Sequence, residues 1–357
     1  MGSVWRKARG AGWGDFPALR LKCTPVYGII ELHPQKRKGA TAMIEKYSDV
    51  LIPQRADPCI LLAPDSWYYF TASVPAFDCI ELRRARTIEE LPTAPTRIVW
   101  RKHADGPMSK YIWAPEIHLV DDGGPEGSKW CIYFAAAGEE PDDKGVFSHR
   151  TYCIQCDGDP MLDDWVEAGQ INTGWESFTI DSTTFEVNGK RYFCWAQRDY
   201  AIPGNSNLYI AEMLTATELK LPATLLTVPE YDWECIGYLV NEGPSVLRHN
   251  GKLYLTYSAS ATDEHYAMGM LTADEDADLL DKNSWHKSPV PVMVTDPAHR
   301  IYGPGHNSFT KDRDGRDLLV FHARPYPGFV GDPLSDPNRH CHVWPVEYDE
   351  NDRPIFN

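Results

Sequence analysis

One short arrangement of residues recurs five times along this 357-residue chain and constrains its fold more than any other feature. In the clearest copy, residues 237–261 read GYLVNEGPSVLRHNGKLYLTYSASA. An acidic residue, Glu242, lies in the first strand-like stretch of this copy. Asn250 and Gly251 then supply the two positive-φ positions that a tight hairpin turn needs. Residues 253–258 alternate between two kinds of side chain, which predicts a second strand with two unlike faces.

The other four copies carry a marked residue at the corresponding place: Asp57, Glu116, Asp181 and His306. Successive marked residues are separated by 59, 65, 61 and 64 positions. Five all-β repeats of roughly sixty residues predict a five-bladed β-propeller, in which each blade is a four-stranded sheet beside a central channel. We therefore expect residues 46–357 to form an all-β, five-bladed propeller domain. Residues 1–45 match no repeat, so we expect a flexible N-terminal extension there.

The two ends of the repeat array are expected to meet. The tail from His340 to Tyr348 alternates like a strand but has no partner in a sixth copy. Either this tail or the segment before Asp57 should complete a blade that both ends of the array share. Such a closure removes exposed sheet edges.

The net charge of the chain limits the classes of partner that it can bind. Asp and Glu number 51 against 35 Lys and Arg, which gives a net charge of −16 and argues against a nucleic-acid partner. No apolar run approaches eighteen residues, so no membrane-spanning segment is expected. Aromatic residues make up 12% of the chain, with 12 tryptophans, as both blade packing and sugar-facing surfaces would require.

The cysteines and the first residues of the chain suggest a compartment. The opening stretch, MGSVWRKARGAGWGD, is basic but lacks the apolar centre of a signal peptide. The nine cysteines are an odd number, lie mostly within strand patterns and occur in a chain without an Asn-X-Ser/Thr site. Buried thiols in a reducing compartment fit this usage, so we expect a cytoplasmic location. Cys153 and Cys156 have the spacing of half a redox or metal site, but no second pair completes it.

The five marked residues should lie on the innermost strands and converge on one axis. Four carboxyl groups and an imidazole in one funnel cannot all be charged without strong repulsion. The pKa of some of the carboxyl groups must therefore rise, which is an arrangement that general acid catalysis uses. Two other interpretations stay open: an acid at a strand start can cap backbone amides or pair with arginine, and His306 can be a core residue, a metal ligand or a substrate contact.

Several motifs resemble those of glycoside hydrolase family 43. They are ADP at residues 56–58, WAPE at 113–116, the isolated Asp181, NEGP at 241–244 and GPGHN at 303–307. The resemblance extends from about Tyr47 to the C-terminus. PQRADP, SVPAFDCIELRRA, YSASATD, YGPGHNSF and DPLSDPNRH together resemble the exo-acting α-1,5-L-arabinofuranosidase branch. Cys79 departs from that branch, which usually has a basic residue at this place.

The resemblance implies an inverting hydrolase that releases terminal α-L-arabinofuranosyl residues from α-1,5-linked arabinan or arabino-oligosaccharides. Asp57 would be the general base that deprotonates the attacking water. Glu242 would be the general acid that protonates the leaving oxygen. Asp181 would raise the pKa of Glu242 and help to hold it in place.

The resemblance also implies supporting roles. Glu116 would support the site, and His306 would contact substrate or hold an ion or water on the axis. The remaining expected substrate contacts are Trp113, Trp195, Asn205 and Arg324. No cofactor would be required, although a structural calcium or other ion on the axis fits the family pattern. The partner would be a carbohydrate, with arabinoxylan side chains as a further candidate.

Other activities use the same apparatus. Within family 43, a β-xylosidase, an endo-arabinanase or a β-galactofuranosidase would carry the same acidic residues. A carbohydrate-binding propeller without turnover is a further alternative, although all three catalytic carboxyl groups are present here. A fructose-transferring propeller would instead need a nucleophilic acid about 5–5.5 Å from the acid/base.

Overall fold

The structure, a computed structural model, describes residues 44–46, 48–121, 127–138, 148–329 and 331–357. The expected extension, residues 1–45, lies outside these ranges except for its last two residues. Residues 44–357 form one compact unit, and the architecture described below is that of this unit alone.

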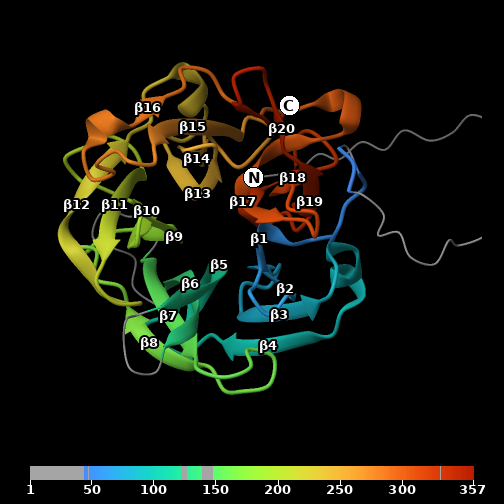
Figure 1. Ribbon diagram of the computed structural model, residues 1–357, viewed down its shortest axis with the longest axis vertical. Helices are drawn as coiled ribbons and strands as arrows, with labels where there is room; N and C mark the ends of the chain where they lie inside the picture. The colour runs from blue at the N-terminus through green and yellow to red at the C-terminus, as the bar shows by residue number, and fades with distance from the viewer. Residues whose placement is uncertain (1–43, 47, 122–126, 139–147, 330) are drawn as a thin grey trace, which may run out of the picture. The chain divides into compact units, whose positions relative to one another are not determined.

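The strands of the unit form five sheets around a common centre, as the repeat predicted (Figure 1). The first sheet contains β1 (Ala56–Leu62), β2 (Tyr68–Ser73), β3 (Cys79–Ala85) and β4 (Thr96–Arg101). The second contains β5 (Lys110–Asp121), β6 (Ser128–Ala137), β7 (Arg150–Cys156) and β8 (Val166–Gln170). The third contains β9 (Thr179–Val187), β10 (Lys190–Gln197), β11 (Asn207–Met213) and β12 (Leu219–Thr227). The fourth contains β13 (Asn241–His249), β14 (Lys252–Ala259), β15 (Ala267–Asp274) and β16 (His286–Lys287).

The fifth sheet contains β17 (Tyr302–Lys311), β18 (Asp317–Arg324) and β19 (His340–Pro345). A hairpin of β20 (Glu347–Tyr348) and β21 (Pro354–Ile355) follows it. The helical turns are η1 (Ile88–Thr93), η2 (Asp232–Glu234), η3 (Lys282–Ser284), η4 (Pro297–His299) and η5 (Pro333–Ser335). Within the described ranges, no helix has the length and apolar character that crossing a bilayer requires. The all-β, five-bladed propeller is therefore confirmed.

The start of the described chain closes the fifth blade. Ile52 forms an antiparallel bridge with Cys341, the second residue of β19. The backbone N–H of Leu51 donates to the carbonyl oxygen of Cys341 at 2.8 Å, and the N–H of Cys341 donates to that of Ile52 at 2.9 Å. In Figure 1 the blue beginning of the described chain accordingly lies beside the red β19. The expected sharing of one blade by both ends of the repeat array is confirmed.

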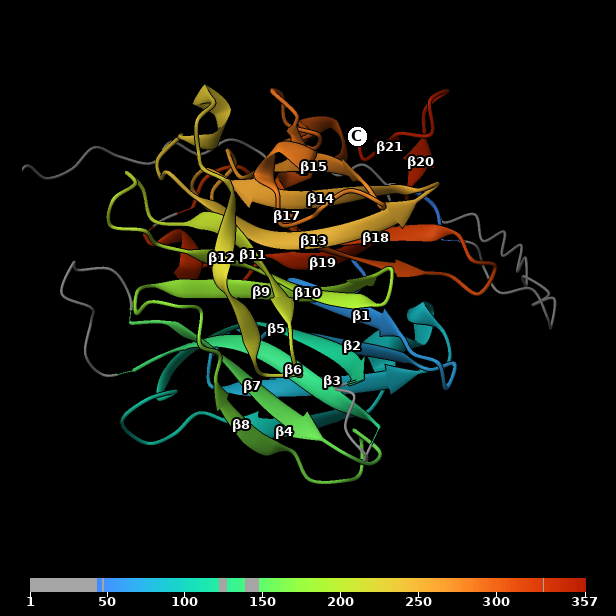
Figure 2. The same ribbon diagram turned by 60° about the vertical axis from the view of Figure 1, so that its left-hand side comes forward.

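The hydrophobic core lies between the blades. Five clusters of buried apolar side chains occur in the described residues, and each consists mainly of residues from two neighbouring blades. Between the first and second blades, for example, the rings of Tyr69 and Trp130 lie 4.7 Å apart between centroids. The sheets are twisted, as the side view in Figure 2 shows, and pack face to face around the ring. This packing leaves the innermost strands, β1, β5, β9, β13 and β17, around the axis.

Each innermost strand contains a β-bulge, where its pairing with the second strand shifts register. Each of these strands has a residue with a positive φ at such a shift: Asp57 (53°), Ala114 (45°), Asp181 (52°), Gly243 (56°) and His306 (42°). β5 and β17 have a second shift, with Tyr111 (48°) and Gly303 (58°). A bulge bends the strand and turns a side chain away from the regular alternation. In three blades the residue turned in this way is a marked one.

The bulges correct the alignment of the repeats that the sequence suggested. Glu116 lies two residues beyond the bulge residue of its strand, Ala114, and Glu242 lies one residue before Gly243. The marked residues are therefore not all at equivalent positions. Gly243 is required where it stands, because a Cβ there would approach Cγ of His306 to 3.1 Å in addition to the strain of a positive φ.

Candidate active site

A cavity of about 620 Å³ is lined by side chains from all five blades. Its lining includes Asp57 from β1, Trp113 from β5, Asp181 from β9, Glu242 from β13 and His306 from β17. The ring thus brings together residues that are far apart in the sequence, such as Asp57 and His306, which are 249 positions apart. The convergence expected from the repeat occurs for Asp57, Asp181, Glu242 and His306.

Asp57 is 7% exposed and is held by partners from two blades. The hydroxyl of Ser73, at the end of β2, donates a hydrogen bond of 2.6 Å to its Oδ2. On the other side, Oδ1 lies 3.3 Å from Nδ1 of His306 and 3.4 Å from Nη1 of Arg339. Both of these basic residues belong to the fifth blade and its connections, so the first and last blades build the surroundings of Asp57 together.

His322 orients the backbone of Asp57. The N–H of Asp57 donates to Nδ1 of His322 at 3.0 Å, so this nitrogen carries no proton. Burial also lowers the pKa of His322 to about 3, which keeps the ring neutral. His322 Nδ1 lies 3.3 Å from Oδ1 of Asp57, but a neutral ring that accepts at Nδ1 contributes no ion pair there.

The charge state of Asp57 follows from these contacts. Burial alone would raise its pKa, but the charges of His306 and Arg339 oppose this effect and hold the pKa well below the usual range for an aspartate. Asp57 is therefore an ionised carboxylate at neutral pH. An ionised carboxylate in a cavity can accept a proton from a water molecule.

Glu242 has the opposite character. It lines the cavity and is partly exposed to it. Burial by the surrounding protein raises its pKa to about 7, and the charge of Asp57 adds to this effect. The hydroxyl of Tyr266, which donates to its Oε1 at 2.8 Å, and the charge of Arg339 act in the other direction. Glu242 therefore retains a proton at a pH where Asp57 has lost its own.

Asp181 lies beside this acid. Its Oδ2 accepts a hydrogen bond of 3.0 Å from the backbone N–H of Gly243, the residue that follows Glu242. Burial and then the charges of Glu242 and Asp57 raise the pKa of Asp181 well above its usual value. Two carboxyl groups that affect one another in this way titrate as a pair, so Asp181 and Glu242 together hold a proton near neutral pH.

Glu116, for which a supporting role was expected, lies outside the cavity lining. The side chain is buried, and its Oε2 lies 2.9 Å from Nε2 of His118. Its charge still contributes to the raised pKa of Asp181. Glu116 therefore acts on the site electrostatically, from the wall of the channel.

Two other expected substrate contacts, Trp195 and Arg324, also lie away from the cavity lining. Trp195 is 0% exposed, and its Nε1 donates to Oε1 of Gln197 at 2.7 Å within the core. Arg324 is 3% exposed and donates to the carbonyl oxygens of Thr262 and Pro333, each at 2.6 Å. The structure therefore places both side chains in the protein interior and not at the cavity surface.

Trp113 and Asn205, the other two residues predicted to contact substrate, line the cavity. The Trp113 ring stacks on that of His149, with 3.9 Å between centroids, and meets Phe77 edge to face. The N–H of Asn205 donates to the carbonyl oxygen of Leu239 at 2.8 Å, and its Oδ1 accepts from Arg198 at 3.3 Å. These contacts hold both side chains in place at the cavity wall.

Four residues that contact the acidic groups were not predicted: Ser73, Tyr266, His322 and Arg339. The motif DPLSDPNRH contains Arg339 and could have indicated it, because a buried aspartate often pairs with a nearby arginine. Tyr266 follows the motif YSASATD by three residues and resembles any other strand tyrosine in its pattern. Of these four contacts, the sequence therefore carried a signal for Arg339 and little for Tyr266.

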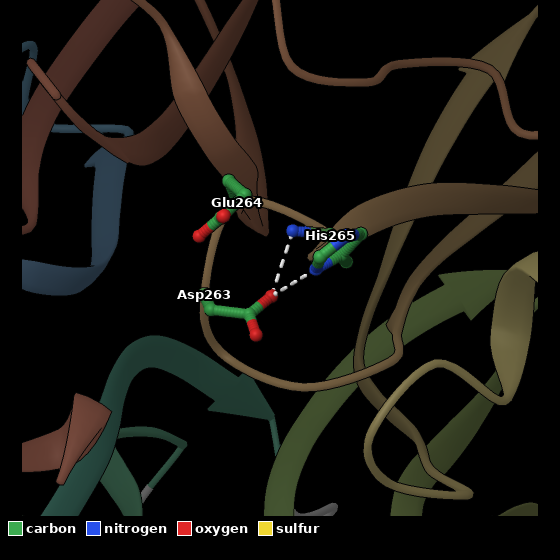
Figure 3. A group of neighbouring side chains, drawn as sticks. All are labelled: Asp263, Glu264 and His265. Atoms are coloured by element: carbon green, nitrogen blue, oxygen red, sulfur yellow. Dashed lines mark hydrogen bonds and ion pairs between the residues drawn. The ribbon is translucent and has the colours of Figure 1, made fainter. Parts of the chain in front are cut away.

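Within the described part of the chain, one group of side chains has donor atoms near enough to share an ion: Asp263, Glu264 and His265. Figure 3 shows that Oδ1 of Asp263 is already engaged by the backbone and side-chain nitrogens of His265, at 2.8 and 2.9 Å. These residues belong to the connection between β14 and β15 and do not line the cavity. His306, the expected ion-holding residue, directs its Nδ1 to Asp57 and Asp181 instead, at 3.3 and 3.7 Å.

Comparisons with known proteins agree with this geometry. Residues 47–354 match the model of a family described as "Glycosyl hydrolases family 43". An "Extracellular exo-alpha-(1->5)-L-arabinofuranosidase" of Streptomyces chartreusis is 48% identical over 80% of this chain and 85% of its own length. A protein of the same name from Streptomyces avermitilis is 47% identical over 87% of this chain. The chain spans 63% of the length of that second relative.

Solved structures support the same relationship. The crystal structure of an α-L-arabinofuranosidase from Lactobacillus brevis has a TM-score of 0.82 and 54% identity, over 86% of this chain and 95% of that one. A xylan β-1,4-xylosidase from Bacillus halodurans has a TM-score of 0.62 at 16% identity, over 88% of this chain and 56% of that one. The second likeness shows the fold alone.

The expected cytoplasmic location is wrong on this comparison, because both Streptomyces relatives are named as extracellular proteins. The cysteines misled the prediction for a physical reason. Of the eight described cysteines, all are free thiols and only Cys235 is not buried. Thiols shielded in a core behave as small apolar side chains, so their number says little about the redox state outside the molecule.

The acidic residues of the motifs lie around one cavity. The family model covers residues 47–354, and a relative is 48% identical over most of both chains. On these grounds the chain belongs to glycosyl hydrolase family 43.

Proposed function

We propose that this protein is an inverting α-L-arabinofuranosidase that removes terminal arabinofuranosyl residues from α-1,5-linked arabinan or arabino-oligosaccharides. One observation carries the proposal: a single cavity holds one carboxylate whose pKa is held low, Asp57, and one carboxyl group whose pKa is raised, Glu242. Two carboxyl groups whose pKa values are shifted in opposite directions match a general base and a general acid. The names of the Streptomyces relatives supply the sugar and the linkage.

The reaction needs both groups at once. Cleavage of a furanoside passes through an oxocarbenium-like state at the anomeric carbon. Glu242 gives its proton to the leaving oxygen as that bond breaks. Asp57 takes a proton from the water that attacks the opposite face of the sugar, so a single displacement inverts the anomeric configuration. Asp181, whose pKa is raised by burial and in part by the charge of Glu242, accepts a hydrogen bond from the backbone N–H of Gly243 and so holds the chain next to the acid.

The wall of the cavity also offers surfaces that a sugar could contact. Its wall includes Pro333 and Leu334 from η5, which Arg324 ties to the fifth blade. Tyr111 and Tyr238 also line the cavity and are 44% and 51% exposed. We propose that these two rings contact the leaving part of the substrate, since aromatic faces pack well on the apolar faces of sugars.

The carbohydrate is the proposed partner, and no nucleic acid or membrane is part of this proposal. No cofactor is required in it, because side chains fill both proton-transfer roles. An ion on the axis would be structural. His306 would reach it through Nε2 or a water molecule, since Nδ1 faces the carboxylates.

The test is the digestion of linear α-1,5-arabinan, followed by chromatography of the products and by NMR in the first minutes. We expect monomeric arabinose from the start, with the β-anomer appearing first. A ladder of oligomers would instead indicate an endo-arabinanase. The absence of any product would indicate a carbohydrate-binding propeller without turnover. Parallel assays with nitrophenyl xyloside, nitrophenyl galactofuranoside and sucrose test the other activities of this fold.

The pH dependence of kcat/KM follows from the two charge states. Glu242 must hold its proton and its pKa is raised to about 7, so activity should fall as the pH rises through about 7. Asp57 must be ionised and its pKa is lowered, so activity should persist below the usual pKa of an aspartate, 3.8, as long as the protein stays folded. A pH profile from 3 to 9 on arabinobiose locates the alkaline limb and shows whether activity persists below 3.8. An alkaline limb near 4.5, the ordinary value for a glutamate, would contradict the assignment of Glu242.

A further inference from the structure

Tyr266 makes a contact with Glu242 that no role assigned so far explains. It lies just before β15, and its hydroxyl donates a hydrogen bond of 2.8 Å to Oε1 of Glu242. The side chain is 1% exposed although it borders the cavity. Burial, followed by the charges of the three carboxyl groups, raises the pKa of Tyr266 well above 10, so this hydroxyl remains a donor.

The direction of this hydrogen bond decides where the proton of Glu242 can be. A protonated carboxyl group has one oxygen that carries hydrogen and one carbonyl oxygen that accepts. Because Oε1 accepts from Tyr266, it is the carbonyl oxygen, and the proton is left on Oε2. We propose that Tyr266 is a positioning residue that keeps the catalytic proton of Glu242 on Oε2. This inference rests on the proposed role of Glu242 as general acid.

The surroundings of Tyr266 leave its ring little freedom. The ring lies parallel to that of His322, with 5.8 Å between centroids and 4° between planes. On another side it presses against the backbone of Gly305, where a Cβ would approach Cε1 of Tyr266 to 2.5 Å. The glycine before His306 in GPGHN thus makes room for the tyrosine. Since His322 also accepts from the backbone N–H of Asp57, the same stack contacts both catalytic residues, Glu242 through its carboxyl group and Asp57 through its backbone.

Loss of the hydroxyl should have a specific kinetic effect. In the Tyr266→Phe variant the ring keeps its place, so KM should not change. The proton of Glu242 is then free to move between two oxygens, only one of which is directed to the leaving oxygen. The net free energy of one such hydrogen bond corresponds to a change in rate by a factor on the order of ten. The factor should apply only where protonation of the leaving group limits the rate.

The pH profile provides a second measurement. The groups that act on the charge of Glu242 are Tyr266 itself, Asp57 on β1, Asp181 on β9 and Arg339 before β19. Of these, Tyr266 stabilises the ionised form by donating to it. Its removal should therefore shift the alkaline limb of kcat/KM to higher pH, while the acidic limb, which belongs to Asp57, stays where it is.

Tyr257→Phe is a matched control. The hydroxyl of Tyr257 donates to Oε1 of Glu234 at 2.8 Å, its side chain is 0% exposed, and it belongs to the same blade. It does not line the cavity. This variant loses a buried tyrosine–glutamate hydrogen bond of the same length without touching Glu242, so it measures the general effect of such a loss.

The experiment measures kcat and KM of the wild type, Tyr266→Phe and Tyr257→Phe on arabinobiose and on nitrophenyl arabinofuranoside, across the pH range. For Tyr266→Phe we expect kcat on arabinobiose to fall on the order of tenfold, less than twofold on the nitrophenyl substrate, and a shifted alkaline limb. Tyr257→Phe should show none of these changes.

Equal losses on both substrates, or an unshifted limb, would overturn the inference and leave Tyr266 a structural role. Inactivity of the wild type on both arabinofuranosides would instead contradict the proposed function itself. Thermal unfolding of the three proteins shows whether the losses arise from instability. If Tyr266→Phe is unstable, the pH profile of its residual activity still decides, because a partly unfolded population changes the amplitude of the profile and not the position of its limb.

Discussion

Turnover of arabinobiose is expected to fall by about 10²–10⁴-fold when Glu242 is replaced by alanine, which is the usual contribution of one general acid or base. Without the acid, the leaving oxygen must depart as an alkoxide. A phenolate departs without protonation, so the same variant should keep much more of its activity on a dinitrophenyl arabinofuranoside. The ratio of the two rates, relative to wild type, measures this dependence on the leaving group.

Glu242→Gln serves as a control of similar shape. Glutamine can still accept the hydrogen bond of Tyr266, so the cavity should stay intact, yet it has no acidic proton to give. It should lose activity on arabinobiose as alanine does. Near-normal hydrolysis of arabinobiose by either variant would exclude Glu242 as the general acid.

Replacement of Asp57 should be equally severe, with a different pattern. Without the base, the attacking water keeps its proton, whichever leaving group is present. The loss of about 10²–10⁴-fold should therefore be similar on arabinobiose and on the dinitrophenyl substrate. Asparagine is the better replacement than alanine, because Asp57 has a φ of 53° and asparagine tolerates this region.

A small anion should distinguish the two acidic residues further. Azide needs no deprotonation and can attack in place of water in Asp57→Asn, which would yield a β-arabinofuranosyl azide and restore turnover. Detection of this product by NMR checks the prediction. An α-azide would point to a covalent intermediate and a retaining mechanism, and would contradict the role of Asp57 as a base.

The architecture could be predicted from the sequence because it depends on repeated short-range features. Alternating residues and tight turns such as Asn250-Gly251 specify strands and hairpins locally. Five copies with similar spacing then specify the number of blades. The unpaired edges of an open ring predict that the two ends meet, and the structure shows the bridge between Ile52 and Cys341. Asp57, Asp181, Glu242 and His306 reach one cavity for the same reason.

The details of the site depend on contacts that the linear sequence does not contain. Ala114 adopts a positive φ although alanine has no preference for it, so nothing in the sequence shows that Glu116 lies past the bulge. Trp195 and Arg324 resemble cavity residues by type, but the packing of neighbouring blades buries both. Tyr266 becomes important only because Gly305, 39 positions later, leaves space for its ring.

The place where the ring of blades closes has a consequence for how the protein would lose its activity. Asp57 follows the closing residue Ile52 by five positions, and its basic partners, His306 and Arg339, belong to the other end of the array. The catalytic base is thus assembled across the joint between the first and last blades. A molecule that opened at this joint would lose hydrolytic activity while most of its β-structure persisted. Turnover therefore reports on whether the ring of blades is closed.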